Sequence, residues 1–294
     1  MKISICIPCF EQVEYLAKCM DSIVSQTYLN YEVIISDDSI TDGVRNYIID
    51  LEKVFNGKLF YFRNSPSKGT PGNWNQAMDM ATGDFIHLLH HDDYYASPDS
   101  LKNIMDAANT YPDTNVFIGE VLSHNISEKS LTKHVVVDEY LNDLHSNPSK
   151  ILFANLLGPP SIVFLRKSAL IYFNVKLKWL VDMEYYYRLF KANSNWMFVR
   201  KPFVVSVNNA DHNVTNECYS NPEVEVFEYT YLYNRVISGF IPSISFLCLI
   251  RRLFLKYGLF SFQEVLSLCK TEKIPWFYKP LIKILRIEYA LKAK

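Results

Sequence analysis

Two histidines and two aspartates, His90-His91-Asp92-Asp93, stand side by side directly after the apolar run DFIHLL. A carboxylate that follows a buried strand is costly to desolvate unless a cation or hydrogen-bond donors offset its charge. Mg²⁺ and Mn²⁺ prefer a few carboxylates together with water and phosphate oxygens, so these residues suit a divalent cation that also holds a diphosphate. A polar turn ahead of the next helix explains Asp92 and Asp93 equally well.

Acidic residues also follow two other apolar runs in the first half of the chain. Glu11 comes shortly after ISICIP, and Asp37-Asp38 come directly after YEVIIS. In a parallel sheet the carboxyl ends of the strands meet at one edge, and ligands bind there. We therefore expect these acids to converge with residues 90–93 on one site, although an Asx turn is the alternative for Asp37 and Asp38.

Other interpretations of these motifs are disfavoured. The His-Asp pair resembles the metal box of helical phosphohydrolases, but here it follows a strand, whereas a helical box needs its ligands on helices. Cys6 and Cys9 form a CxxC, yet an offset of three along a strand turns the two thiols to opposite faces, unlike a zinc site. The loop GTPGNWN at 69–75 lacks the Lys-Ser/Thr ending of a Walker loop.

The elements that position these residues follow from hydrophobic periodicity. Apolar runs predict buried parallel strands at 3–8, 31–36, 59–63 and 84–89. Apolar residues at helical spacing predict helices at 16–24 and 74–81, and Ser97-Pro98-Asp99 predicts the start of another. This alternation indicates an α/β fold with a right-handed, mostly parallel sheet that is covered on both faces.

The alternation is lost after about residue 116. VFIGEV and SIVFLR predict strands, whereas PSKILFANLLG at 148–158 and VDMEYYYRLF predict helices. We therefore expect residues 116–221 to share the sheet with residues 1–115 and to build the other wall of a cleft. We expect residues 222–294 to form a helical C-terminal extension.

The composition limits the partners and the location of the protein. The formal net charge of the 294 residues is −1, and no basic cluster is interleaved with aromatics in the first half, so nucleic acid is not an expected partner. The six cysteines are scattered, no signal-peptide pattern is present and no apolar run reaches about 18 residues. These features indicate a cytoplasmic protein.

Four segments together resemble a known family. In order and spacing, ISICIPCFEQ, VIISDDSITD, NQAMDMATGDFIHLLHHDD and VDMEYYYRL resemble the inverting family 2 glycosyltransferases of the GT-A fold, over about the first 215 residues. Within this family, the sequence stretch GTPGNWNQA…HLLHHDDYY is most similar to bacterial transferases that build O-antigen or capsular polysaccharide. The resemblance implies a Rossmann-like nucleotide-sugar-binding half at 1–115 and an acceptor-binding half at 116–221 on one continuous sheet.

The resemblance also implies roles for residues that bind the donor. Pro8, Phe10 and Glu11 match the loop that holds the nucleotide base, and Phe10 would stack on that base. Asp38 matches the residue that hydrogen-bonds the base or the ribose. Asn75 matches an asparagine of the donor-binding half.

The metal motif departs from the family pattern. The family's DxD aligns with His90-His91-Asp92, so Asp92 keeps the position that coordinates Mn²⁺ or Mg²⁺, while His90 replaces the usual first aspartate. Asp93 matches a frequent extra acid that would orient water or the donor sugar, and His91 lies among these donor-site residues. Two interpretations of His90 are open, namely contact with the donor's ribose or phosphate and simple packing.

Residues of the second half complete the implied site. Asp182 falls where the family places its catalytic base, which takes the proton of the acceptor hydroxyl as that oxygen attacks the anomeric carbon; a helix cap is the alternative. Glu184 would point away from Asp182 on a helix. His212 matches a histidine that closes over the diphosphate or the metal, with packing or a surface position as the alternative.

Two cations of the family pattern are missing. Trp74 and the pair Asn208-Asn209 stand where relatives often carry arginine. Lys68 or Arg63 would have to compensate near the phosphates.

The C-terminal extension combines basic and apolar residues. Segments 245–260 and 274–292 mix aromatic and branched residues with the cations Arg251, Arg252, Lys256, Lys279, Lys283 and Arg286. Such helices can lie on an anionic membrane surface, which suits a peripheral protein on the inner face of the cytoplasmic membrane. Packing on the catalytic domain is the alternative.

We therefore expect an inverting, metal-dependent glycosyltransferase that moves a sugar from a nucleotide diphosphate donor to a polyprenyl-linked glycan acceptor. A sugar nucleotidyltransferase is an alternative, but it should carry a glycine- and basic-rich loop after the first strand, and ICIPCFEQ has none. A non-catalytic nucleotide-sugar-binding assembly subunit is a further alternative, which the altered DxD and the missing arginines support.

Overall fold

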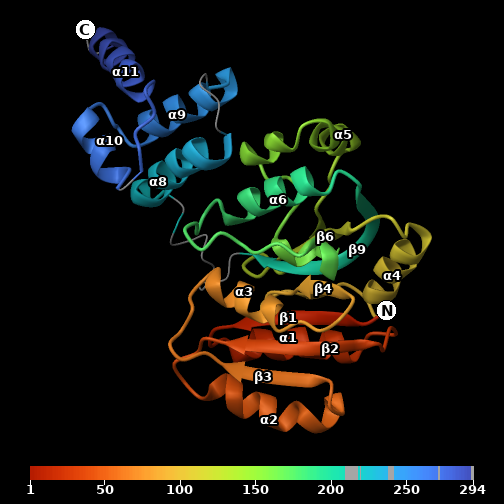
Figure 1. Cartoon of the computed structure of the whole chain (residues 1–294). Helices are drawn as coiled ribbons and strands as arrows, with labels where there is room; N and C mark the ends of the chain where they lie inside the picture. Colours follow the sequence, from red (N-terminus) through yellow and green to blue (C-terminus); the bar gives the residue numbers. More distant parts are fainter. Residues whose placement is uncertain (209–217, 219, 238–241, 271, 293–294) are drawn as a thin grey trace.

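The computed structural model describes residues 1–208, 218, 220–237, 242–270 and 272–292. In this part of the chain a nine-stranded sheet has the order β3-β2-β1-β4-β8-β6-β9-β5, and β7 pairs with β6 (Figure 1). The strands are β1 Ile3–Cys9, β2 Tyr31–Asp37, β3 Leu59–Arg63, β4 Phe85–Leu88, β5 Tyr94–Tyr95, β6 Val116–Asn125, β7 Ser130–Lys133, β8 Val163–Arg166 and β9 Trp196–Asn208. The α-helices are α1 Val13–Val24, α2 Gly43–Phe55, α3 Gly72–Asp79, α4 Ser100–Thr110, α5 Asp138–Ser146, α6 Val181–Ala192, α8 Pro222–Leu232, α9 Ile244–Lys256, α10 Phe262–Leu268 and α11 Tyr278–Lys292.

The first half of the sheet is parallel, as the alternation of apolar runs predicts. β1 pairs in parallel with β2 and β4, and β2 pairs in parallel with β3, so the carboxyl ends of these strands share one edge. The second half is mixed, because β8 runs antiparallel to both β4 and β6, whereas β6 and β9 are parallel. The sheet is continuous across both halves, as expected.

Helices cover both faces of the sheet, and each face has its own apolar core. The apolar stripe predicted for the first helix is buried in α1 except for Val24, which is exposed. α1 shares one core with α2 and α4, while α3 and α6 pack on the opposite face. Cys6 belongs to the α3–α6 core and Cys9 to the α1–α4 core. Their thiols therefore lie on opposite faces of the sheet, which confirms that the CxxC is not arranged as a zinc site.

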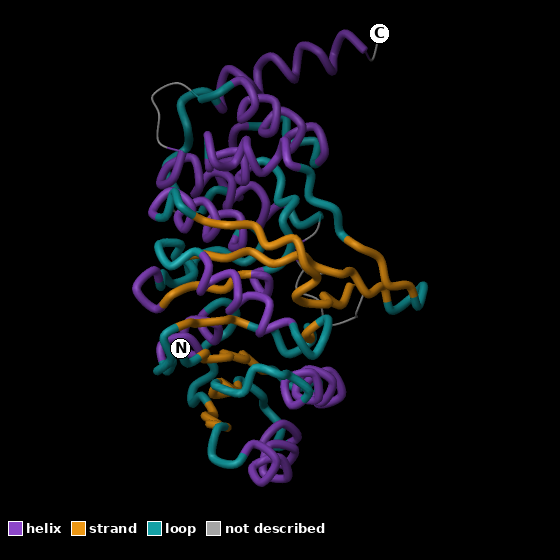
Figure 2. Tube along the Cα trace, turned by 90° about the vertical axis from the view of Figure 1, so that its right-hand side faces the viewer, coloured by secondary structure: helices purple, strands orange, loops and turns teal. Residues whose placement is uncertain are grey.

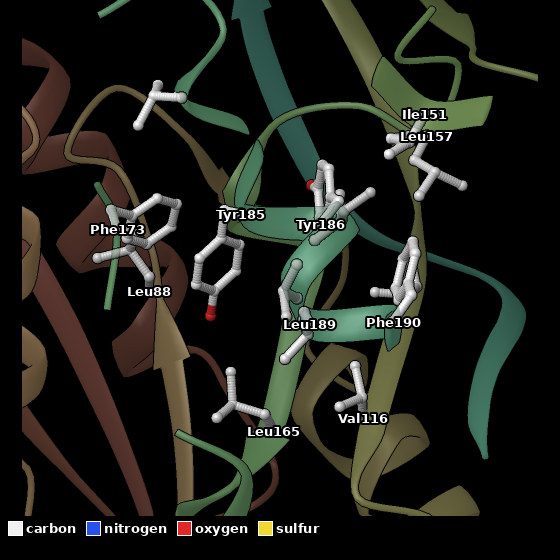
Figure 3. Packing of buried hydrophobic residues seen from close by; sticks show 14 of the residues in the cluster. Leu88, Val116, Ile151, Leu157, Leu165, Phe173, Tyr185, Tyr186, Leu189 and Phe190 are labelled. Carbon is white, nitrogen blue, oxygen red and sulfur yellow. The ribbon is translucent and has the colours of Figure 1, made fainter. Parts of the chain in front are cut away.

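Aromatic packing anchors α6 on the second half of the sheet. Tyr185, Tyr186 and Phe190 of this helix are buried, and Figure 3 shows them among the apolar side chains of neighbouring strands. The ring of Tyr185 stacks on that of Phe173 with 3.9 Å between the centroids. This packing fixes the axis of α6, whose first turn carries Asp182.

The helix predicted over residues 148–158 is wrong. The structure has a short 3-10 helix, η1 Pro148–Leu152, followed by irregular chain. The side chain of Asn155 accepts hydrogen bonds from the backbone N–H groups of Leu157 and Gly158, and Gly158 has a φ of 128°. These local bonds compete with helical ones, and a residue with that φ cannot continue a helix.

The C-terminal extension is helical, as predicted. α8 to α11 pack around their own apolar cluster, and Figures 1 and 2 show them at one end of the molecule, away from the strands β1 to β3. No helix within the described ranges is both long and apolar enough to cross a bilayer.

Candidate active site

A cavity of about 550 Å³ opens at the carboxyl ends of β1 and β4. Its lining includes Pro8 and Phe10 after β1, residues 90–93 after β4, and Asp182 at the start of α6. Segments that are far apart in the sequence therefore meet around one space. Phe10 is 51% exposed, so its ring is accessible for stacking at the rim.

The residues after β4 form an acidic and imidazole cluster. Ligand atoms of His90, Asp92 and Asp93 all lie within 4.8 Å of one another. Asp93 is only 3% exposed, and its Oδ1 accepts a hydrogen bond from the Val207 N–H at 3.3 Å. Its Oδ2 lies 3.8 Å from Nδ1 of His90.

Burial controls the charge of this cluster. Burial, and then the neighbouring Asp92, raise the pKa of Asp93 to about 8, and burial lowers the pKa of His90 to about 4. Among the described residues, Nε2 of His90 and Oδ2 of Asp93 are buried without a hydrogen-bond partner. Buried polar atoms of this kind are normally satisfied, so the cluster fits a divalent cation that the carboxylates would ligate.

Asp182 lines the same cavity, in the first turn of α6. Burial alone raises its pKa to about 7. A carboxyl group that titrates near neutral pH is well matched to accept a proton from a hydroxyl group. Glu184 is turned away and is engaged by Arg188, whose Nε donates to Oε1 of Glu184 at 2.6 Å.

Asp38 does not line the cavity. Its Oδ2 accepts from the backbone N–H of Gly69 at 2.7 Å and of Lys68 at 3.0 Å, and its Oδ1 accepts from Nδ2 of Asn64 at 2.8 Å. The same Nδ2 of Asn64 also donates to Asn73, which does line the cavity. Asp38 thus shapes the loop between β3 and α3 and reaches the cavity through two asparagines.

Asp37, the residue before Asp38, forms an Asx turn, which is the alternative interpretation of this pair of aspartates. The Ser39 N–H donates to Oδ1 of Asp37 at 2.8 Å, and the Tyr61 hydroxyl donates to its Oδ2 at 2.7 Å.

Two other residues predicted to bind the donor also lie outside the lining. Glu11 accepts from the backbone N–H groups of Ile40 and Thr41, and the hydrogen bonds with Thr41 lower its pKa. The carboxamide of Asn75 makes two hydrogen bonds with the backbone of Phe173. Its Oδ1 accepts from the N–H at 2.7 Å, and its Nδ2 donates to the carbonyl oxygen. Both side chains therefore hold the loops that surround the cavity.

The basic side chain in the cavity wall is neither Arg63 nor Lys68, the two residues expected from the sequence. Arg63 is engaged by Asp42 and donates to the carbonyl oxygens of residues 39–41, and Lys68 is absent from the lining. Among the described lining residues, Lys178 supplies the basic side chain. His212, also predicted near the diphosphate or the metal, lies outside the described residues.

The sequence motifs also miss part of the wall. Trp74 replaces an expected arginine, and its ring lies 4.5 Å from the His90 ring between centroids. Trp179 and Tyr229 line the cavity from the loop before α6 and from α8. The position of Trp179 next to VDMEYYYRL could have flagged it, whereas Tyr229 lies in the extension, where no motif pointed to the site.

Comparison with known proteins decides the family. The model of glycosyl transferase family 2 matches residues 4–172, more than half of the chain. The chain belongs to this family. The matched part of this family 2 protein contains β1 except for its first residue, all of β4 and the whole of the 90–93 cluster.

One relative of this family 2 chain is the GalNAc(5)-diNAcBac-PP-undecaprenol beta-1,3-glucosyltransferase of Campylobacter jejuni, 31% identical over 108 residues. The match covers 37% of this chain and 35% of that protein, so the chain spans about a third of that relative's length.

Two solved structures share the fold. S. aureus TarS 1-349 in complex with UDP-GlcNAc has a TM-score of 0.63 at 17% identity, covering 96% of this chain and 78% of that one. The mannosyltransferase PcManGT from Pyrobaculum calidifontis, in complex with GDP-Man and Mn²⁺, has a TM-score of 0.58 at 13% identity, covering 99% and 80%. The expected GT-A fold is confirmed.

Proposed function

We propose that this protein transfers a sugar, with inversion at the anomeric carbon, from a nucleotide diphosphate donor to a glycan acceptor. The observation that carries the proposal is that Asp182, with a pKa of about 7, faces the same cavity as the carboxylates of Asp92 and Asp93. The same cavity thus offers a proton acceptor and a place for a charged diphosphate. Membership of glycosyl transferase family 2 supports the same reaction.

In the proposed reaction, Asp182 takes the proton of an acceptor hydroxyl as its oxygen bonds to the anomeric carbon. The bond from that carbon to the phosphate oxygen breaks, and its electron pair leaves with the nucleotide diphosphate. Mn²⁺ or Mg²⁺, held by Asp92 with Asp93 and His90, would offset the charge on the diphosphate. Within the part of the lining that the structure describes, Lys178 offers a basic side chain for the same charge, and Phe10 would stack on the base.

A lipid-linked acceptor in bacterial surface polysaccharide synthesis is the acceptor class that we propose. The named relative from Campylobacter jejuni carries undecaprenol in its name, and the solved neighbours contain UDP-GlcNAc and GDP-Man. We do not favour a nucleotidyltransferase, because ICIPCFEQ has no glycine- and basic-rich loop and because the family match points to sugar transfer.

We also propose that α11 brings the protein to the lipid-linked acceptor at an anionic membrane surface. Exposed residues of this helix form two adjacent stripes, a basic one at Lys279, Lys283 and Arg286 and an apolar one at Ile284, Ile287 and Leu291. The apolar side chains are 52%, 53% and 69% exposed. Exposed apolar groups beside cations suit the boundary between anionic headgroups and acyl chains.

The function is tested by incubating the protein and Mn²⁺ with UDP-, GDP-, CDP- and dTDP-sugars and a polyprenyl-diphosphate glycan, with the product linkage determined by NMR. The proposal expects a new glycosidic bond whose anomeric configuration is opposite to that of the donor. Retention of configuration would contradict the single displacement. Donor binding without any turnover would favour the non-catalytic assembly subunit.

A further inference from the structure

The helix that carries Asp182 begins without a side-chain cap of its own. The residue at its N-cap position is Leu180, which has no polar side-chain atom. The preceding turn, Lys178 to Leu180, presents three successive backbone N–H groups toward buried surroundings. Such groups need acceptors, because an unpaired buried N–H is costly.

Glu228 of α8 supplies these acceptors from the C-terminal extension. Its Oε1 accepts from the N–H of Lys178 at 2.6 Å, and its Oε2 accepts from the N–H of Trp179 at 3.0 Å and of Leu180 at 2.7 Å. Glu228 is only 2% exposed, so water does not compete for its oxygens. A carboxylate at this place is also favoured by the positive end of the α6 dipole.

The turn that Glu228 holds is itself part of the cavity wall. Lys178, Trp179 and Leu180 all line the cavity, and Asp182 follows two residues after Leu180. Tyr229, the neighbour of Glu228 on α8, lines the same cavity. A shift of this turn would therefore move the cavity wall and the carboxylate of Asp182 together.

We propose that Glu228 is a positioning residue for the transfer reaction, which makes α8 of the C-terminal extension a working part of the active site. Its carboxylate fixes the turn Lys178–Leu180 and thereby places Asp182 against the acceptor hydroxyl. This inference rests on the proposed function, since it assigns Glu228 to the placement of the proposed base.

Glu225 offers a matched control on the same helix. It is also buried, and its Oε1 accepts from Nζ of Lys256 at 2.8 Å and from the Ser220 N–H at 3.2 Å. These contacts join α8 to α9 and to Ser220 just before the extension, and they do not involve the turn before α6. Glu225→Gln therefore reports the effect of a comparable loss on α8 that leaves this turn in place.

The experiment compares Glu228→Gln, Glu228→Ala and Glu225→Gln by melting temperature, donor affinity, steady-state kinetics and hydrogen exchange at the amides of residues 178–180. Glutamine keeps one acceptor oxygen, whereas alanine keeps none. We expect kcat to fall about 10-fold in Glu228→Gln and about 100-fold in Glu228→Ala, because small misplacements of a catalytic group have effects of this size. Donor affinity should stay within about 3-fold, and exchange at the three amides should accelerate.

If Glu228 only stabilised the fold, the kinetic result would be different. The kcat of the Glu228 variants would then fall only as far as that of Glu225→Gln at equal loss of melting temperature, and this outcome would overturn the inference. Absence of transfer by the wild-type protein would instead refute the proposed function. Hydrogen exchange needs no turnover, so unchanged exchange in Glu228→Gln and Glu228→Ala overturns the positioning role even in that case.

Discussion

At the scale of residues, the immediate surroundings distinguish two similar carboxyl groups. Asp38 is surrounded by N–H donors and builds a loop, whereas Asp182 has its pKa raised to about 7 by burial. The sequence motifs indicated both acids, but they could not distinguish these environments. The donors to Asp38 come from a loop about 30 residues further along the chain, and only the folded arrangement brings them together.

The raised pKa of Asp182 predicts a pH dependence of catalysis. The proposed base works only when it is deprotonated, so kcat should rise with pH and level off above about 7. A profile of kcat from pH 5 to pH 9, at saturating donor and acceptor, measures this rise. A rise near pH 4, the ordinary range of an aspartate, would show that burial does not control the base.

The same pKa predicts an effect on stability of the opposite sign. The folded state holds the proton of Asp182 more tightly than the unfolded state, so the stability associated with the neutral carboxyl is lost as the pH rises through about 7. Asparagine cannot ionise. In thermal unfolding without metal, Asp182→Asn should melt a few degrees above the wild type at pH 8, and the difference should vanish near pH 4. A lower melting temperature at pH 8 would contradict this reasoning.

At the scale of elements, local patterns predict most of the first half and less of the second. The apolar runs of β1 to β4 and the stripe of α1 are set by neighbouring residues, so periodicity finds them. The antiparallel direction of β8 depends on partners about 50 and 80 residues away, which no local pattern encodes. In the same way, Glu228 looks like an ordinary solvent-facing acid in PEVEVFEYTYL, because its partners lie 48 to 50 residues earlier.

The contact between β6 and β9 predicts that Gly119 cannot be enlarged. A Cβ at this position would lie 2.8 Å from Cδ1 of Phe203, next to the point where the pairing register shifts. Gly119→Ala should lower the free energy of unfolding by about 2 kcal/mol, the usual scale of overpacking, as measured by urea unfolding. Gly72→Ala at the start of α3 is the control, because its Cβ meets Lys68 Cβ at 3.3 Å and should cost less than about 1 kcal/mol. Equal losses of unfolding free energy in Gly119→Ala and Gly72→Ala would rule out the steric explanation.

At the scale of the whole molecule, two helices of the C-terminal extension have different surroundings. α8 contacts the turn that precedes Asp182, whereas α11 lies further from the sheet and exposes its cations and apolar residues (Figure 1). Composition alone indicated a basic and apolar extension. It could not separate the buried stripe of α11, which includes Ile282 and Leu285, from the exposed one.

The exposed stripes of α11 predict binding to anionic vesicles. Each cation near such a surface contributes about 1 kcal/mol, so changing Lys279, Lys283 and Arg286 together to glutamine should weaken binding about 100-fold. Co-sedimentation with phosphatidylglycerol–phosphatidylcholine vesicles measures the effect. The control changes three exposed lysines of the catalytic part to glutamine: Lys53, Lys102 and Lys129. Equal losses in the two triple variants, or equal binding to purely zwitterionic vesicles, would contradict the proposal.

The most direct test of the account is the turnover of Asp182→Asn, measured beside its affinity for the donor nucleotide with Mn²⁺. Because asparagine keeps the shape of the side chain but cannot accept the proton, kcat should fall about 1,000-fold while the donor dissociation constant stays within about 3-fold of the wild-type value. A kcat within about 10-fold of the wild type would mean that the proton goes elsewhere, and the cavity between Asp92 and Asp182 would not be the site of the proposed reaction.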